Sequence, residues 1–254
     1  MKKMKKIGII GAKGMVGQNL VNLYSGDNNV FSITRENIET YKNFKFDLIF
    51  LAAADGRKYI ANKEPYLDLI SIMNLMNTVR YYDADKIVLI STIDVYNTVM
   101  NNGDENTKLA ITFPSYGSNR LQLEFALRGL FKEKLLVIRL QGLIAENLKK
   151  NLLFDIKNNR TLANFSNDTT FQFYPLNRLR KDIDVVLSMQ IRLCNLSAEP
   201  ISIKELYSIL NKKLNVSKTK EIISTNYNVK SIHNRYWVDK AMVISEIKNY
   251  LNIL

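Results

Sequence analysis

The sequence contains a single cysteine, Cys194, and a single histidine, His233. One cysteine excludes an intrachain disulfide, and one histidine excludes a metal site built from several imidazoles. The sequence also lacks any apolar run near the roughly 18 residues that a membrane-spanning helix needs. We therefore expect a metal-free protein of the reducing cytoplasm that does not span a membrane.

The composition is that of an ordinary globular protein with an excess of positive charge. Of 254 residues, 46% are apolar and 24% are charged, and the formal net charge is +12. Such a charge suits nucleic acid, a membrane surface or an anionic substrate. The lysines are scattered rather than gathered in one tract, and no nucleic-acid motif combines basic with aromatic residues. We expect no nucleic-acid partner.

The first part of the chain alternates strand patterns with helix patterns. The segment 46–54 is apolar enough to be buried on both faces of a parallel sheet. Strands and helices that alternate at this spacing predict an α/β fold with a doubly wound parallel sheet. The predicted strands are 6–10, 30–35, 46–54, 86–92 and 135–144, and the predicted helices begin near residue 15 and cover 65–82 and 115–131.

Three glycines separate the first predicted strand from the first helix, in Gly11-Ala-Lys-Gly14-Met-Val-Gly17. In such a turn the first glycine permits the tight turn, the second lets the backbone approach a pyrophosphate, and the third lets helix and strand pack closely. The phosphate lies at the helix N-terminus. In this context the spacing predicts a dinucleotide site. We assign to it Gly11, Lys13, Gly14, Met15, Val16 and Gly17, together with Thr34, Arg35, Ala52, Ala53 and Ala54 after the next two strands.

The choice of cofactor depends on the end of the second predicted strand. It reads Ser32-Ile33-Thr34-Arg35, without an acidic residue to accept hydrogen bonds from the adenosine ribose of NAD. The forked cation of Arg35 suits a 2′-phosphate, and Lys13 is a second positive charge on the same side. We therefore expect NADP rather than NAD. The alternative is that Arg35 stacks on the adenine and Lys13 is a solvated loop residue.

Beyond residue 145 the elements become shorter. Ser202 and Glu205 form a capping-box pair at the start of one helix. We predict a strand at 169–176 and helices at 148–158, 178–193, 202–214 and 239–251. The expected organisation is a dinucleotide-binding Rossmann domain, 1–145, with a small substrate-binding region, 146–254, partly interleaved with it.

A second group of residues is formed by Ser91-Thr92-Ile93-Asp94-Val95-Tyr96 and by Tyr116-Gly-Ser-Asn-Arg120. It resembles extended short-chain dehydrogenases, whose fourth strand ends in Ser/Thr-x-x-Val-Tyr and whose next helix carries Tyr-x-x-x-Lys. The turn GAKGMVG is similar to that of GDP-fucose synthases, which use NADPH and carry a basic residue at the position of Lys13. The chain also resembles a shorter subgroup of the NAD-dependent epimerase/dehydratase family, in which Tyr-x-x-x-Arg and a LKKN stretch recur.

This resemblance implies roles for three residues. Tyr116 would pass a proton to or from a sugar hydroxyl as hydride moves to or from the nicotinamide. Thr92 would hold the same oxygen by a hydrogen bond. Arg120 would bind the nicotinamide ribose, so that Tyr116 and Arg120 also belong to the cofactor site. The family's lysine at position 120 lowers the tyrosine pKa, and an arginine does not reproduce an ammonium.

The resemblance also bears on the reaction. Nucleotide-sugar dehydratases carry Thr-Asp-Glu-Val-Tyr where this chain has Thr92-Ile93-Asp94. One of the two proton carriers for water elimination is therefore missing, which favours redox or epimerase chemistry. Asp94 either faces the substrate or caps a helix or a loop.

Further candidates for the substrate site lie after residue 145. Lys149, Lys150 and Asn151 stand where the family places the segment that meets the substrate diphosphate. The alternative is a solvated lysine pair. Weaker candidates for the same pocket are Gln172, Tyr174 and Arg178.

The sequence thus predicts an NAD(P)-dependent oxidoreductase or epimerase that acts on a nucleotide-activated sugar. The apolar faces of helices 65–82 and 115–131 would permit a homodimer. The rival hypothesis is a catalytically silent Rossmann module that senses NADP(H) or serves as a subunit, and the missing lysine at position 120 is its best support.

Overall fold

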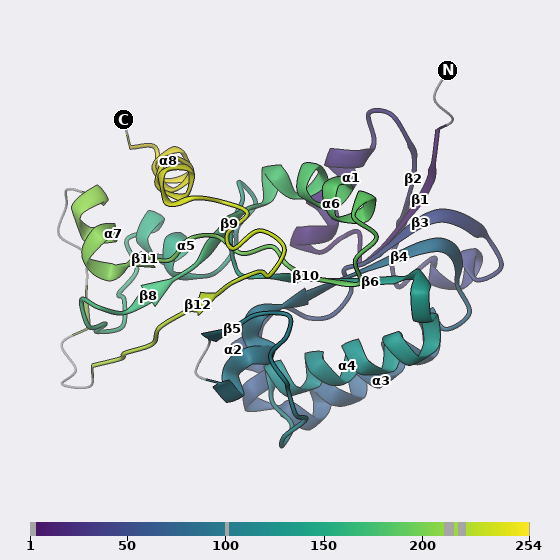
Figure 1. The fold of residues 1–254 in the computed structure, drawn as a ribbon, viewed down its shortest axis with the longest axis horizontal. Coiled ribbons are helices and arrows are strands. Elements are labelled where there is room, and N and C mark those ends of the chain that lie inside the picture. Colours follow the sequence, from purple (N-terminus) through teal and green to yellow (C-terminus); the bar gives the residue numbers. More distant parts are fainter. Residues whose placement is uncertain (1–3, 100–101, 211–215, 218–221, 254) are drawn as a thin grey trace. The chain divides into compact units, whose positions relative to one another are not determined.

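The computed structural model describes residues 4–99, 102–210, 216–217 and 222–253. Its central sheet has six strands in the order β2-β1-β3-β4-β6-β10 (Figure 1). The pairings of β1 with β2 and β3, and of β3 with β4, are parallel. The strands are β1 (Lys6–Ile10), β2 (Asn29–Ile33), β3 (Lys45–Leu51), β4 (Asp83–Thr92), β6 (Leu135–Leu140) and β10 (Leu193–Asn195). The strand order reverses between β1 and β3, which is where open α/β sheets bind ligands.

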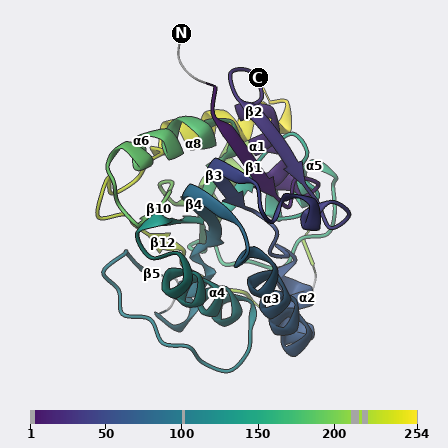
Figure 2. The ribbon, with the colours of Figure 1, turned by 90° about the vertical axis from the view of Figure 1, so that its right-hand side faces the viewer.

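Helices cover both faces of this sheet (Figures 1 and 2). On one face lie α1 (Met15–Tyr24) and α6 (Leu179–Ser188), and on the other α3 (Pro65–Val79) and α4 (Tyr116–Phe131). This arrangement confirms the predicted Rossmann fold with a doubly wound sheet. None of the helices in the described part of the chain has the length and apolarity needed to cross a lipid bilayer.

The core of the sheet comes from its apolar strands. All residues of β6 are buried, as are Leu48, Ile49, Phe50 and Leu51 of β3. A strand buried on both faces has no room for the alternation of polar and apolar residues. For this reason the continuous apolar runs in the sequence are good predictors of these strands.

A buried polar network attaches α4 to the sheet. The Ser91 hydroxyl on β4 donates a 2.6 Å hydrogen bond to one Glu124 oxygen, and the Arg139 guanidinium on β6 donates a 2.6 Å bond to the other. The side chains of Arg139 and Glu124 are 3% and 0% exposed. Because the Glu124 carboxylate is fully buried, its bonds to residues of two sheet strands fix the position of α4.

The chain divides into two compact units. One consists of residues 1–95, 108–139 and 177–194 and holds most of the sheet, and the other consists of residues 96–107, 140–176 and 195–254. In the second unit α8 packs on β7, β9 and α5. Its elements are β5 (Asn102–Gly103), β7 (Gly142–Ile144), α5 (Leu152–Lys157), β8 (Thr170–Phe171), β9 (Phe173–Pro175), β11 (Ile201–Ser202), α7 (Ile203–Leu210), β12 (Asn228–Val229) and α8 (Lys240–Leu251).

Two predicted strands are each divided by a glutamine. The strand predicted at 135–144 is β6 and β7, and the Oε1 atom of Gln141 between them accepts a 2.9 Å bond from the Ala198 N–H. The strand predicted at 169–176 is β8 and β9, separated by Gln172. In both places a buried side-chain amide bonds the backbone of a distant segment, which apolar periodicity does not reveal.

Several predicted boundaries were wrong. The helix predicted at 178–193 ends at Ser188, because Gln190 adopts a left-handed φ of 55° and the chain then enters β10. The helix predicted at 148–158 begins only at Leu152, where the Asn151 side chain caps it by accepting the Phe154 N–H. The strands predicted to reach 35 and 54 end at Ile33 and Leu51.

The other helices follow their predictions more closely. The capping box is confirmed, since the Ser202 backbone N–H donates to Glu205 and the Glu205 N–H donates to the Ser202 hydroxyl. Residues 211–214 of the helix predicted at 202–214 lie outside the described residues. The helix predicted at 65–82 ends at Val79, and the six-residue helix α2 (Lys58–Lys63) was not predicted.

Candidate functional site

The glycine turn lies at the carboxyl end of β1. Gly11 has a φ of 91°, and a Cβ there would lie 2.5 Å from the carbonyl oxygen of Ala52. A Cβ on Gly17 would lie 2.1 Å from the carbonyl oxygen of Gly11. Both positions therefore require glycine, one for its conformation and one for the close approach of α1 to the turn.

The start of α1 leaves backbone donors available. The helix has no side-chain cap at Gly14, and its first intrahelical bond runs from the Gln18 N–H to the Gly14 carbonyl at 2.8 Å. The N–H groups of Met15, Val16 and Gly17 thus have no partner within the helix. Such donors, together with the helix dipole, bind phosphate. The turn fits the pyrophosphate of a dinucleotide.

Ala52, Ala53 and Ala54 follow β3 beside this turn. The Ala52 N–H donates a 2.8 Å hydrogen bond to the Ile10 carbonyl, which extends the pairing of β3 with β1 by one residue. All three alanines are half-buried.

An acidic residue that the sequence reasoning missed lies at the end of β2. The Glu36 carboxylate is 2.9 Å from Lys13 Nζ and accepts a hydrogen bond from the Thr34 hydroxyl. The Thr34 hydrogen bond, and then the Lys13 ammonium, lower the pKa of Glu36 to about 2. Arg35 is exposed, and a hollow of about 250 Å³ is lined in part by Lys13 and Thr34. The acid follows Arg35 directly, so a search one residue further would have found it.

Tyr116 is the first residue of α4 and is 8% exposed. Its backbone N–H donates a 2.9 Å hydrogen bond to Asn62 Oδ1 on α2. Burial raises the pKa of the Tyr116 phenol. Among the smaller effects, the Arg120 cation lowers this pKa, the Asp94 carboxylate raises it, and the Thr92 hydroxyl lowers it. The phenol is therefore protonated at neutral pH.

Thr92 and Asp94 lie together at the carboxyl end of β4. The Thr92 hydroxyl accepts a 3.1 Å hydrogen bond from the Asp94 N–H and lies 3.4 Å from Asp94 Oδ2. The other Asp94 oxygen is 2.6 Å from Lys58 Nζ on α2. The structure thus brings Thr92, Asp94 and Tyr116 together as predicted and adds Lys58, which lies on a helix without a clear periodic pattern.

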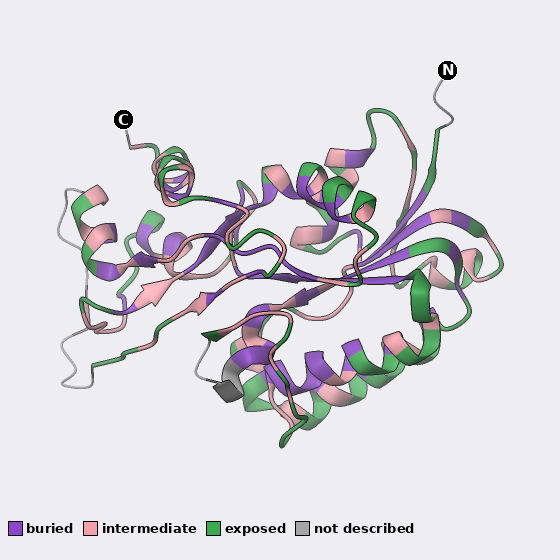
Figure 3. Cartoon of the chain, in the orientation of Figure 1, coloured by how far each residue is buried: buried purple, intermediate pink, exposed green. Residues whose placement is uncertain are grey.

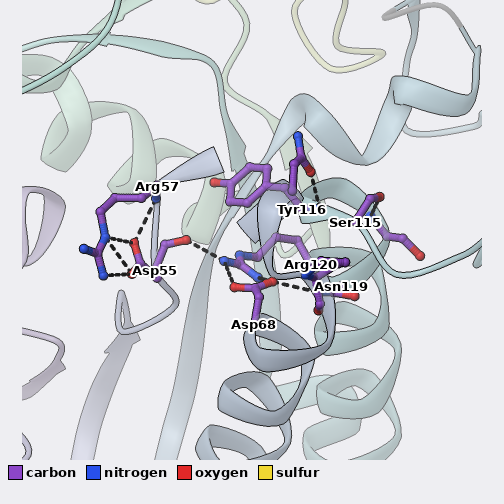
Figure 4. A network of polar contacts seen from close by, with 10 residues as sticks. Asp55, Arg57, Asp68, Ser115, Tyr116, Asn119 and Arg120 are labelled. Atoms are coloured by element: carbon purple, nitrogen blue, oxygen red, sulfur yellow. Dashed lines mark hydrogen bonds and ion pairs between the residues drawn. The ribbon is translucent and has the colours of Figure 1, made fainter. Parts of the chain in front are cut away.

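Arg120 forms the centre of a buried network (Figure 4). Its guanidinium binds Asp68 on α3 through two hydrogen bonds of 2.8 and 2.9 Å and also donates to the Asp55 carbonyl. The side chains of Arg120 and Asp68 are 3% and 6% exposed. The guanidinium also lies 4.6 Å from the centre of the Tyr116 ring. These contacts suit a residue that positions Tyr116, and ribose binding by Arg120 stays a prediction.

The substrate residues predicted after residue 145 do not form one cluster in either unit. Asn151 uses its side chain to cap α5 and to bond the Leu143 carbonyl. Gln172 is buried and bonds the backbone of Ala198 and Val229. Lys149 is exposed, and Lys150 is half-buried. Arg178 belongs to the other unit and pairs with Asp182 at 3.1 Å.

The chain shares its fold with solved sugar-nucleotide enzymes. It matches a dTDP-4-dehydrorhamnose reductase from Bacillus anthracis in complex with NADP, with a TM-score of 0.73, 17% identity and 99% of each chain covered. It matches a UDP-glucuronic acid 4-epimerase from Bacillus cereus in complex with NAD, with a TM-score of 0.68 and 16% identity over 97% of this chain and 98% of that one.

The same fold also occurs with another kind of substrate. An L-threonine 3-dehydrogenase from Trypanosoma brucei matches with a TM-score of 0.72 and 14% identity over 98% of this chain and 97% of that one. No protein-family model matches the sequence, and a comparison with curated protein sequences finds no match. At such low identities the likeness establishes the fold.

The buried pair of Arg120 and Asp68 leads to a stability prediction. Arg120→Met should lower the free energy of unfolding by about 3–5 kcal/mol, because the Asp68 carboxylate would stay buried without a counterion. The double variant Arg120→Met/Asp68→Asn should lose less than Arg120→Met alone, since no charge is then left unpaired. Urea unfolding measures the free energy of unfolding of the double variant and of the single variants Arg120→Met and Asp68→Asn. A double variant whose loss equals the sum of the two single-variant losses would contradict this account.

Proposed function

We propose that this chain is an NAD(P)-dependent oxidoreductase or epimerase that acts on a nucleotide-activated sugar, with Tyr116 as the proton carrier. The observation that carries the proposal is the buried Tyr116 side chain at the start of α4, near Thr92 at the carboxyl edge of the sheet that carries the glycine turn. The sequence resemblance to extended short-chain dehydrogenases, and the fold shared with sugar-nucleotide reductases and epimerases, agree with it.

Tyr116 and Thr92 have different roles at the reacting oxygen of the substrate. The bound nicotinamide supplies or accepts the hydride. Tyr116, held as a neutral phenol by burial, donates its proton to a carbonyl oxygen during reduction. Thr92 holds that oxygen by a hydrogen bond and keeps it close to the phenol. At neutral pH the phenol carries the proton that this step requires.

The cofactor would be held by the groups around the glycine turn. The N–H groups of Met15, Val16 and Gly17 would bind the pyrophosphate. Lys13, Arg35 and Glu36 carry a net charge of +1 at the end of β2. We therefore propose a preference for NADP over NAD, reduced by the Glu36 carboxylate, which pairs with Lys13 and would repel a 2′-phosphate.

The proposed ligands of the substrate come from the segment that follows residue 145 and from the start of α6. Lys149, which is exposed, and Lys150, which is half-buried, remain the proposed ligands of the substrate diphosphate. Asn151, Gln172 and Arg178 stay in the proposal only as weaker candidates, since each already bonds a protein group. The rival function, a silent module that binds NADP(H), is favoured by the engagement of Arg120 with Asp68.

We further propose that the chain forms a homodimer through α3 and α4. The outer side of this helix pair is largely exposed (Figure 3), and it includes Leu67, Ile70 and Met73 of α3, each more than half exposed at 63%, 53% and 51%. An apolar stripe of this kind is typical of an interface with an identical copy. We also propose that the protein works in the reducing cytoplasm, because its single cysteine, Cys194, is buried and cannot form an intrachain disulfide.

The catalytic proposal predicts that Tyr116→Phe keeps the fold and the cofactor affinity but lowers turnover by about 10²–10⁴-fold. The assay is incubation with a panel of nucleotide sugars and NAD(P)(H), followed by mass spectrometry, with L-threonine as a comparison substrate. Phe113→Leu is the matched control, since Phe113 is an aromatic side chain that is 88% exposed. Tight cofactor binding without turnover of any substrate would instead support the silent module.

The cofactor proposal predicts opposite effects of two neighbouring substitutions. Glu36→Gln should raise the affinity for NADP relative to NAD by about 5-fold, the effect of one charge removed near a phosphate in water. Arg35→Asp should reverse or abolish the preference for NADP. Calorimetry with both cofactors measures the ratio. If neither substitution changes it, the 2′-phosphate does not lie near β2.

The dimer proposal predicts that Ile70→Asp yields a monomer in light scattering, with unchanged circular dichroism. A buried charge at an apolar interface costs more than the interface gains. Val185→Asp on α6 is the control, because Val185 is also an exposed apolar residue, at 43%, on the other face of the sheet. A wild-type monomer, or a dimer that survives Ile70→Asp, would refute this interface.

A further inference from the structure

The charges around the Tyr116 phenol come from three elements. Arg120 stands on α4, Asp94 follows β4, and Lys58 comes from α2. Lys58 and Arg120 favour the phenolate, whereas Asp94 disfavours it. Of the two cations, Arg120 is held by Asp68 in a buried bidentate pair, so its position is set by the packing of α3 and α4.

Lys58 reaches this group through a defined path. Its Nζ atom lies 2.6 Å from Asp94 Oδ1, and the other Asp94 oxygen lies 3.4 Å from the Thr92 hydroxyl. Lys58, Asp94 and Thr92 all lie near enough to the Tyr116 phenol to affect its pKa. The side chains of Lys58 and Asp94 are 39% and 15% exposed. Because the pair is partly shielded from water, its charges act on the phenol more strongly than a fully solvated pair would.

The position of α2 is itself tied to Tyr116. Asn62 Oδ1 accepts the backbone N–H of Tyr116 at 2.9 Å. Lys58 and Asn62 are four residues apart in α2 and therefore lie on the same side of the helix. Through this hydrogen bond, the side of α2 that carries Lys58 faces the start of α4, where Tyr116 lies.

We propose that Lys58 is a positioning residue for the reaction: it neutralises Asp94 and so sets the proton affinity of Tyr116. Asp94 alone would place a negative charge beside Thr92 and oppose the phenolate that remains when Tyr116 gives up its proton. Lys58 cancels that charge, and the pair lets the phenol release and regain its proton. Lys58 thereby supplies an ammonium near the tyrosine although position 120 holds an arginine.

The proposal rests on Tyr116 as the proton carrier, but its test does not need turnover. Difluorotyrosine placed at position 116 alone lowers the intrinsic pKa of the phenol, and fluorine NMR then follows its titration in the folded protein. Lys58→Met should raise the midpoint by about half to one pH unit, because a facing cation is lost. Asp94→Asn should lower it by a similar amount, since the facing anion is lost.

Two further variants separate this role from a structural one. The double variant Lys58→Met/Asp94→Asn should titrate near the wild type, and Lys58→Arg should keep the wild-type midpoint because it keeps the charge. Lys63→Met removes a lysine from the same helix at an exposed position and should leave the midpoint unchanged. The proposal is overturned if Lys58→Met leaves the midpoint unchanged, or if both single variants move it in the same direction.

The failure of this proposal is distinct from failure of the proposed function. If no substrate is turned over but the midpoints move as expected, the role of the Lys58–Asp94 pair is supported and the catalytic role of Tyr116 is refuted. If turnover depends on Tyr116 but Lys58→Met leaves the titration midpoint of the phenol unchanged, only the role of Lys58 is refuted.

Discussion

The buried ion pair between Arg120 and Asp68 is the constraint on which the candidate site depends. It joins α4 to α3, and its third hydrogen bond reaches the loop that follows β3. One helical turn further along α4, Glu124 is held by Ser91 and Arg139 of two sheet strands. Two charges buried this deeply tolerate little displacement, because any shift would leave one of them unpaired. The start of α4 is thus held in place, and Tyr116 with it.

A rigid helix start matters because proton transfer depends on distance and direction. In the proposed reaction Tyr116 needs its hydroxyl near Thr92, and both residues belong to elements of the Rossmann fold. The charges that face the phenol are of two kinds: Arg120 is locked in the core, whereas Lys58 and Asp94 lie at the partly exposed edge. The buried Arg120 guanidinium holds α3 and α4 together as well as facing the phenol, so its position is fixed. The charges that can adjust are those of the partly exposed pair, Lys58 and Asp94.

Particular elements explain how far prediction from the sequence reached. The glycine turn was predictable because its requirements are local: Gly11 has a positive φ, and Gly17 lies too close to the turn to carry a side chain. The buried strands were predictable because they carry continuous apolar runs. The helix α2 was missed because six residues, half of them polar, show no usable period. Gln141 and Gln172 were not recognised as strand breaks because their bonds join segments far apart in the chain.

The sequence by itself determined the fold class and the glycine turn, and its resemblance to extended short-chain dehydrogenases implied that Thr92 and Tyr116 act together. The fold class and the turn follow from local spacing and from the regular alternation of strands with helices. Only the tertiary structure decided how the charges are shared: Arg120 bonds Asp68, Lys13 bonds Glu36, and Lys58 bonds Asp94. The partners in these pairs are between 23 and 52 residues apart in the chain. No periodic pattern encodes such distances, because a charged side chain binds whichever opposite charge the packing of helices and strands brings near it.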